Sequence, residues 1–328
     1  MSIPRRFFLQ VMAGAAVVSA FRSGAAESYP SRPITMIVPF PPGGLADVIA
    51  RLLVDGMRAS LGQPVVIENV GGATGSIGTG RVARATSDGY TVALGIWNTH
   101  VANGAMYALP YDVVSDFEPI VLLADAPLLL VAKKSVPAND LNEFIAWLKE
   151  HPDTVSMSTV GAGSPGHLLG LLLQKETGTR FGQIPYRGAN PAMQDVVAGQ
   201  IDAMFSNPAT ALVHVRAGSI KGFAVTAKQR LAVAPEVPTT DEAGLPGFYF
   251  SLWAGLFAPR GTAKDIIAML KAAAVKALDD AAVRRALADQ GLEIPPRERQ
   301  TAEVLAAYQK AEIEKWWPII RATNIKPE

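Results

Sequence analysis

The sequence predicts an α/β protein of two domains, each built on a parallel-rich sheet flanked by helices. From residue 34 onward, short apolar runs alternate with longer amphipathic runs, which is the pattern of strands and helices in a parallel sheet. The same alternation starts again after residue 127. A third section then opens with another strand-like run. We therefore expect the chain to build most of one domain, to form the second, and to return to the first.

The elements follow from this alternation in chain order. In the first section we expect strands at 34–39, 64–70 and 90–95 and helices at 46–61 and 76–85. In the second section we expect strands at 128–132, 155–159, 181–186, 202–205 and 222–226, and helices at 140–151, 166–178 and 190–198. The last section predicts a strand at 249–258 and helices at 263–278, 281–291 and 301–322.

These elements imply the domain boundaries. Domain 1 is expected to comprise residues 27–126 and 250–328, and domain 2 residues 127–249. Turn-rich stretches near 124–128 and 246–251 would form the hinge between them. Ligands of open α/β sheets bind beyond the carboxyl ends of the strands, so the strand-to-helix loops are where a site is expected.

The N-terminus has the order of a cleaved export signal, which predicts a periplasmic protein. Arg5 and Arg6 precede an apolar run that ends at Phe21, and small residues follow up to Ala26. We expect residues 1–26 to be removed. The arginine pair with the following Phe8-Leu9 resembles a twin-arginine signal, and an ordinary secretory signal remains the alternative. No later stretch is long and apolar enough to predict a membrane span.

Composition excludes several classes of function. Of the 328 residues, 30 are Lys or Arg and 29 are Asp or Glu, and without the first 26 residues the net charge is −2. A chain this close to neutral predicts no nucleic-acid partner and no anionic membrane partner. The chain has no cysteine, which excludes disulfides, thiolate metal sites and a cysteine nucleophile.

The loop after the first expected strand reads Pro39-Phe40-Pro41-Pro42-Gly43-Gly44. The prolines stiffen it, and the glycines let backbone amides approach a ligand. The helix that follows begins with free N–H groups and a partial positive charge, so the loop suits an anion. Asp47 is more consistent with a helix cap or a pair with Arg51 than with a ligand contact.

The loop at 71–78 resembles a nucleotide-binding loop, because Gly72, Gly75 and Gly78 have the spacing seen in some short-chain dehydrogenases. The tight G-x-G turn is missing, however, and no tyrosine has a lysine four residues later for proton transfer. We therefore expect a second anion cradle of backbone amides. An exported NAD(P)-dependent oxidoreductase that uses this loop is the alternative.

The loop at 158–167 contains Ser164 but lacks the glycine of a hydrolase elbow, because Ala162 stands two residues before the serine. Ser164 and nearby amides are better placed as donors to a second anionic group. His167 is either a packed residue at a helix start or a ligand contact. The four histidines show no metal-binding spacing, so we expect no metal, no cofactor and no catalytic residue.

The segment Pro185-Tyr186-Arg187-Gly188 follows a strand of the second section. Tyr186 is a candidate to pack over the carbon skeleton of a ligand, and Arg187 is a candidate partner for a carboxylate. A solvated or domain-bridging arginine is the alternative for Arg187.

Blocks along the whole mature chain resemble the Bug family, the periplasmic receptors of tripartite tricarboxylate transporters. They include Arg32-Pro33-Ile34, Pro42-Gly43-Gly44, Asp88-Gly89-Tyr90-Thr91, Pro185-Tyr186-Arg187-Gly188, Gly199-Gln200-Ile201-Asp202 and Pro235-Glu236-Val237-Pro238-Thr239. The resemblance implies a Venus-flytrap fold of the type II periplasmic binding class. It also implies that backbone amides and ordered waters hold a small organic acid, and that membrane permease subunits or a sensor protein receive the loaded receptor. The alternative that the protein is a sensory receptor that serves no transporter stays open.

Two departures from the family's pattern suggest a more apolar ligand. Leu45-Ala46 stand where a small hydroxyl residue is usual, and Trp97-Asn98 stand where small polar residues are common. If these side chains face the ligand, an acid with an aromatic or alkyl body is the hypothesis. The residues expected to bind ligand are Phe40, Pro42, Gly43, Gly44, Leu45, Gly72, Ala73, Thr74, Trp97, Asn98, Thr159, Gly163, Ser164, His167, Tyr186, Arg187, Gly188, Asp202 and Asn207.

Overall fold

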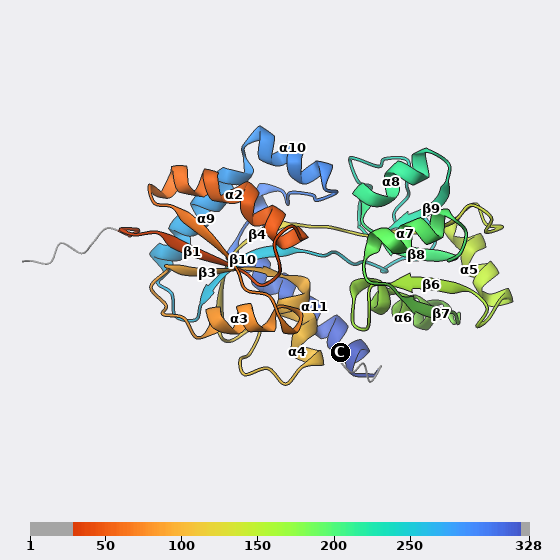
Figure 1. Cartoon of the computed structure of the whole chain (residues 1–328), viewed down its shortest axis with the longest axis horizontal. Helices are drawn as coiled ribbons and strands as arrows, with labels where there is room; N and C mark the ends of the chain where they lie inside the picture. Colours follow the sequence, from red (N-terminus) through yellow and green to blue (C-terminus); the bar gives the residue numbers. More distant parts are fainter. Residues whose placement is uncertain (1–28, 323–328) are drawn as a thin grey trace, which may run out of the picture.

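Two five-stranded sheets, one in each half of the molecule, organise the fold in the computed structural model, which describes residues 29–322 (Figure 1). The predicted export signal and its cleavage site lie outside the described residues. The predicted fold class is confirmed: the protein is a two-domain α/β protein whose sheets are flanked by helices.

The first sheet has the strand order β2-β1-β3-β10-β4. Its strands are β1 (Ile34–Val38), β2 (Val65–Asn69), β3 (Thr91–Ile96), β4 (Phe117–Ala124) and β10 (Ala254–Pro259). β1 pairs in parallel with β2 and β3, whereas β10 is antiparallel to both β3 and β4. β10 is therefore the strand by which the chain returns to this sheet after building the other half.

Helices cover both faces of the first sheet. They are α2 (Leu45–Leu61), α3 (Ser76–Ala83), α4 (Asn103–Met106), α9 (Lys264–Leu278), α10 (Ala281–Asp289) and α11 (Ala302–Ala322), with short helical turns at Ala73–Gly75, Asn98–Ala102 and Arg297–Arg299. Successive side chains of a strand point to opposite faces. Met36 accordingly packs in a cluster with Leu53 of α2 and Leu270 of α9, whereas Ile37 shares the opposite cluster with Leu305 of α11.

The second sheet repeats the mixture of pairings in the order β7-β6-β8-β5-β9. Its strands are β5 (Leu129–Lys133), β6 (Ser156–Thr159), β7 (Gly182–Pro185), β8 (Ala203–Ser206) and β9 (Ile220–Val225). β6 is parallel to β7 and β8, and β5 is antiparallel to β8 and β9. Each sheet thus contains two parallel and two antiparallel pairs, which is less parallel than the alternation in the sequence alone implies.

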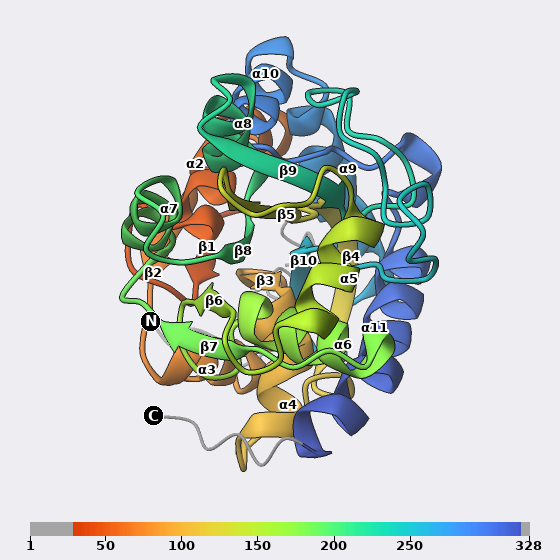
Figure 2. The ribbon, with the colours of Figure 1, turned by 90° about the vertical axis from the view of Figure 1, so that its right-hand side faces the viewer.

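Four helices enclose the second sheet, two on each face (Figure 2). They are α5 (Leu141–Glu150), α6 (Pro165–Thr177), α7 (Ala189–Val197) and α8 (Pro208–Arg216). Val131 of β5 packs with Met193 of α7 and Leu212 of α8. Leu130, the preceding residue, packs on the opposite face in the cluster that contains Phe144 of α5 and the apolar residues of α6.

Two extended segments run side by side between the halves (Figure 1). The N–H of Ala126 donates to Ser251 Oγ over 2.8 Å, and the N–H of Leu252 donates to the Ala126 carbonyl over 2.9 Å. The hydroxyl of Thr226, at the end of β9, donates to the Phe250 carbonyl over 2.8 Å. These contacts lie in or beside the stretches near 124–128 and 246–251, whose role as a hinge stays a prediction.

The strand directions turn one edge of each sheet toward the other half. β4 leads directly into the connection at residues 125–128, and β1 and β3 have the same direction as β4, so their carboxyl ends point toward the second half. β5 leaves that connection, and β8 runs antiparallel to it with Ser206 opposite Leu129. The carboxyl ends of β6, β7 and β8 therefore point back toward the first half. We call the segments after these strands, residues 39–44, 70–75, 97–98, 160–164, 186–188 and 207, the facing loops.

Candidate ligand-binding site

The first two facing loops are tied together by Asn69, the last residue of β2. Its Nδ2 donates to the Phe40 carbonyl and to Asp47 Oδ1, both over 3.0 Å. Phe40 also places its ring tip against the second loop, since a Cβ built on Gly75 would lie 3.1 Å from Phe40 Cζ. The segments at 39–44 and 70–75 therefore form one unit. Asn69 was not among the residues predicted from the sequence. A polar residue at the end of a strand could have indicated that it holds the loops together.

Asp47 organises the turn into α2 rather than contacting a ligand. Its carboxylate accepts from the N–H of Gly43 over 2.9 Å and from Arg51 Nε over 2.8 Å. The bond from Arg51 is the main reason that the pKa of Asp47 is lowered from its usual value to about 2. The predicted pair with Arg51 is thus present. The N–H of Gly43, predicted to meet the ligand, is engaged within the loop.

The glycine loop after β2 has an unusual backbone. Gly72, Ala73, Thr74 and Gly75 have φ angles of 117°, 46°, 53° and 88°, so four consecutive residues have positive φ. Two of them are not glycine, and such residues are held in this region only where the surrounding structure enforces it. Ala73, Thr74 and Gly72 are exposed. A strained, exposed loop with N–H groups at the edge of a sheet is suited to holding an anion.

The third glycine of that loop has a packing role. A Cβ on Gly78 would lie 2.5 Å from the Val70 carbonyl oxygen and 3.0 Å from Pro39 Cα, so only glycine fits between them. The glycine spacing that resembles a nucleotide loop is thus explained in part by contact between the two loops.

Trp97 does not line a ligand site in this structure, which corrects the prediction. It is 0% exposed, and its indole N–H donates to Glu312 Oε2 over 2.8 Å. Its ring packs edge-on against Phe250 in the connection and against Trp316 of α11. Trp97 therefore supports the segment between the halves. Asn98, the next residue, is partly exposed and remains a candidate contact.

In the second half, the loop after β6 wraps around the start of α6. The N–H of Gly163 donates to His167 Nδ1 over 3.0 Å, and Ser164 caps the helix by accepting from the N–H of His167. Because Nδ1 accepts a hydrogen bond, the ring proton of His167 lies on Nε2. Burial lowers the pKa of His167, so the ring is neutral at pH 7. Thr159 is buried, and its hydroxyl accepts from the N–H of Gly161 over 3.3 Å.

The loop after β7 carries the cation of the facing loops. Arg187 is exposed and forms no ion pair within residues 29–322. Tyr186 is partly buried and donates from its hydroxyl to Asp195 over 2.5 Å, and Gly188 is the residue before α7. Among the facing loops, Arg187 is the one residue with a formal charge.

Asp202 lies at the wrong end of β8 for the predicted role. It precedes the strand, next to the pairing of Ala203 with Ala132, and therefore sits at the edge of the sheet far from the first half. Its carboxylate pairs with Lys133 Nζ over 2.6 Å and accepts from the Ser156 N–H over 2.7 Å. Asp202 thus joins the starts of β6 and β8 and does not reach the facing loops.

Asn207 follows β8 and caps α8 by accepting from the N–H of Ala209 over 2.8 Å. A Cβ on Gly291, which belongs to the first half, would lie 2.9 Å from Asn207 Oδ1. Asn207 is therefore in close contact with the other half of the molecule. The other predicted residues lie in the facing loops or within three residues of them: Phe40, Pro42, Gly43, Gly44, Leu45, Gly72, Ala73, Thr74, Asn98, Thr159, Gly163, Ser164, His167, Tyr186, Arg187 and Gly188.

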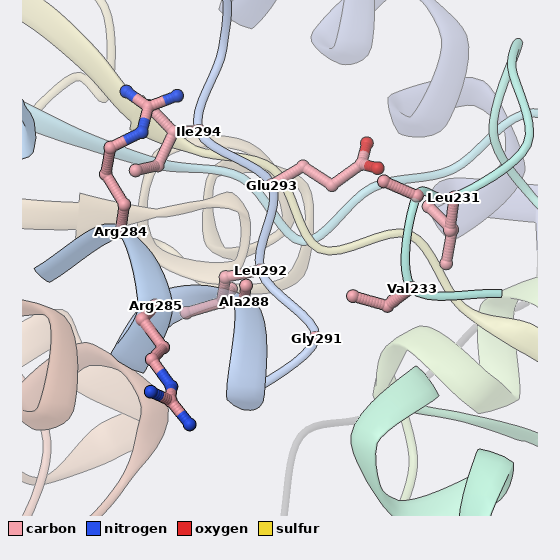
Figure 3. A pocket seen from close by; sticks show the side chains of 10 residues that line it. Leu231, Val233, Arg284, Arg285, Ala288, Gly291, Leu292, Glu293 and Ile294 are labelled. Carbon is pink, nitrogen blue, oxygen red and sulfur yellow. The ribbon is translucent and has the colours of Figure 1, made fainter. Parts of the chain in front are cut away.

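A pocket of about 500 Å³ lies elsewhere between the halves, between α10 and residues 231–233 (Figure 3). Leu231 and Val233 line it from one half, and Leu292 and Ile294 line it from the other. The predicted ligand-binding residues are not part of its lining. Between residues 29 and 322, no group of histidine, aspartate and glutamate side chains is arranged to hold a metal ion. In the same range, no helix is both long and apolar enough to cross a membrane.

Two α/β domains with glycine-rich loops at facing sheet edges define the class of the two-domain solute-binding receptors. Residues 49–325 match the family described as "Tripartite tricarboxylate transporter family receptor", and the chain belongs to this family. It is 39% identical to Protein BugT of Bordetella pertussis over 305 residues, which cover 92% of each chain. The predicted resemblance to the Bug family is confirmed.

Solved structures of the same type are similar over nearly the whole chain. MatC of Rhodopseudomonas palustris with bound malate is 40% identical, with a TM-score of 0.74 over 89% of this chain and 100% of that protein. A Rhodopseudomonas palustris protein with adipate is 30% identical, with a TM-score of 0.75 over 92% of this chain and 100% of that one. A TctC solute-binding protein from Polaromonas without ligand is 30% identical, with a TM-score of 0.80 over 90% of this chain and 100% of that one.

Proposed function

We propose that this protein is a periplasmic receptor that holds a small carboxylate between its two domains and delivers it to the membrane subunits of a tripartite tricarboxylate transporter. The observation that carries the proposal is the orientation of the strands, which directs glycine-rich loops from both sheets toward each other. Family membership and the malate-bound and adipate-bound relatives support a carboxylate as the ligand.

Backbone N–H groups, together with Arg187, supply the attraction for the acid. The first N–H groups of α2 have no acceptor within their own helix, and the positive end of the helix dipole adds to their effect. Charged hydrogen bonds of this kind contribute about 1.5–3 kcal/mol each when the donors are held in place. The ties from Asn69 and Asp47 hold the first two loops in this way.

Domain closure would complete the site. A ligand that contacts both halves stabilises the closed state by as much as its affinity for that state exceeds its affinity for the open one. The two connections, joined by the bonds between Ala126, Ser251 and Leu252, are the proposed hinge, with domain 1 formed by residues 27–126 and 250–328. The closed surface would then signal occupancy to the transporter.

We further propose that the protein has no catalytic role. Ser164 and His167 are not arranged as nucleophile and base, because the hydroxyl caps α6 and the ring nitrogen Nδ1 accepts from Gly163. The missing tight G-x-G turn and the lack of a tyrosine with a lysine four residues later argue against the oxidoreductase alternative.

Isothermal titration of the purified protein with malate, succinate, adipate, hexanoate, benzoate, citrate and NAD tests the proposal. We expect at least one acid to bind in the micromolar range or more tightly, and NAD to show no binding. The absence of binding by every acid would contradict the proposed function, and binding of NAD would favour the oxidoreductase alternative. As a separate measurement, mass spectrometry of the small molecules that co-purify with the protein would identify its natural ligand.

A further inference from the structure

We infer that the bound acid has an alkyl or aromatic body, and that Ile77 and Val160 contact this body. The inference rests on the proposed function, because it concerns the specificity of the same site. Trp97 was expected to provide apolar contact but is buried. Ile77 and Val160 are apolar side chains that are exposed in or near the facing loops.

Ile77 lies in the first turn of α3 and is 56% exposed. Its side chain extends back over the glycine loop, since a Cβ on Gly72 would lie 2.7 Å from Ile77 Cδ1. An acid whose carboxylate meets the N–H groups of that loop must therefore carry its body past this aliphatic side chain. Phe40 and Leu45, in and directly after the neighbouring loop, are partly exposed and add to the same apolar surface.

Val160 is the corresponding residue of the second half. It directly follows the last residue of β6 and is 46% exposed. An aliphatic side chain at this position is removed from water when the two edges approach each other over a ligand. Burial of apolar surface favours closure on a ligand that offers apolar surface in return.

Arg187 alone carries a formal charge in the facing loops, so an acid with three carboxylates such as citrate is poorly matched. An acid with one or two carboxylates suits the facing loops better.

Isothermal titration with four acids and three variants tests this inference. Hexanoate and benzoate provide apolar bodies, and malate and succinate are the short polar acids for comparison. The variants are Ile77→Asn, Val160→Asn and, as the matched control, Val213→Asn. Val213 lies in α8, is 68% exposed and is not in a facing loop.

We expect hexanoate or benzoate to bind at least tenfold more tightly than malate and succinate. Ile77→Asn and Val160→Asn should each weaken binding of the apolar acid at least fivefold, whereas Val213→Asn should bind it as the wild type does. The inference is wrong if malate or succinate binds within tenfold of both apolar acids, or if either Ile77→Asn or Val160→Asn keeps wild-type affinity for them. If malate binds and the apolar acids do not, the proposed function stands without this specificity. If no carboxylate binds, the proposed function itself fails.

Discussion

The N–H of Gly163 donates a hydrogen bond of 3.0 Å to Nδ1 of His167, four residues later at the start of α6. Gly163 has a φ of 74°, a conformation that favours glycine. This bond fixes the loop after β6 against the helix and leaves Nε2–H of His167 as the ring donor. Loop geometry and side-chain tautomer are therefore coupled at this edge.

The coupling predicts that His167→Ala weakens acid binding about tenfold, because the loop loses its acceptor. His167→Asn should recover most of the affinity, since asparagine Oδ1 can take the place of Nδ1. His151→Ala, at the exposed end of α5, is the control that should not affect binding. Titration with the tightest-binding acid measures all three. Wild-type affinity in His167→Ala would show that the bond does not matter for the site.

Asp47 is expected to stabilise the first edge. Asp47→Ala leaves the N–H of Gly43 without its acceptor and removes one of the two hydrogen bonds of Asn69 Nδ2, so we expect a loss of about 1–3 kcal/mol in the free energy of unfolding. Asp55→Ala, an exposed change in the same helix, should cost less than about 0.5 kcal/mol.

The effect of Asp47 should depend on pH with a definite sign. Its pKa is about 2 in the folded protein and 3.8 ordinarily, so its stabilising contribution is present above pH 3.8 and is lost as the pH falls toward 2. Urea denaturation at pH 7 and pH 3 should show the difference between wild type and Asp47→Ala becoming smaller at pH 3. A difference that is the same or larger at pH 3 would contradict this assignment.

The buried side chain of His100 leads us to expect a second pH dependence of stability. It is fully buried and stacked on Phe257, and burial lowers its pKa from 6.5 to about 3. Between these values the unfolded chain binds a proton at His100 and the folded protein does not, so stability falls as the pH drops below 6.5. His100→Gln should therefore show a slope of stability against pH that is shallower by up to about 1.4 kcal/mol per pH unit between pH 6 and 4. Equal slopes in urea unfolding would exclude this role.

Closure can be measured with cysteine labels, because the natural chain has no cysteine. Asp55→Cys in α2 and Lys149→Cys in α5 place fluorophores on opposite halves, and both positions are exposed. We expect energy transfer between them to change when the acid is added. Asp55→Cys with Lys264→Cys, both in the first half, should show no change. Identical responses from the two pairs would argue against movement of the domains.

Much of the fold could be predicted from the sequence because its elements carry strong local patterns. The strands at β1, β2 and β3 and the helices α2 and α9 were placed within a few residues. β4 was missed, since residues 107–116 before it contain no clear helix and the run at 117–124 includes Pro119. Helix α8 was also missed, because β-branched residues within it weaken the helical signal, although Asn207 and Pro208 form a typical helix start.

The site could be predicted less completely, for a physical reason. Loops at the carboxyl ends of strands follow from topology, so the glycine-rich segments were found in the right place. The direction of a single side chain depends on tertiary packing, and Trp97 points into the core because Glu312, far away in sequence, accepts its N–H. Asp202 was misplaced because it lies directly before β8, and the motif around it gives no information about which end of the strand faces the other domain.

A crystal structure of the protein grown with its tightest-binding acid most directly tests the claim that backbone amides at facing sheet edges hold the ligand. The account predicts the carboxylate within about 3.2 Å of N–H groups in the loops at 39–45 and 70–76, with residues of the loop after β6 on the other side. A carboxylate found instead in the pocket between α10 and residues 231–233 would contradict it.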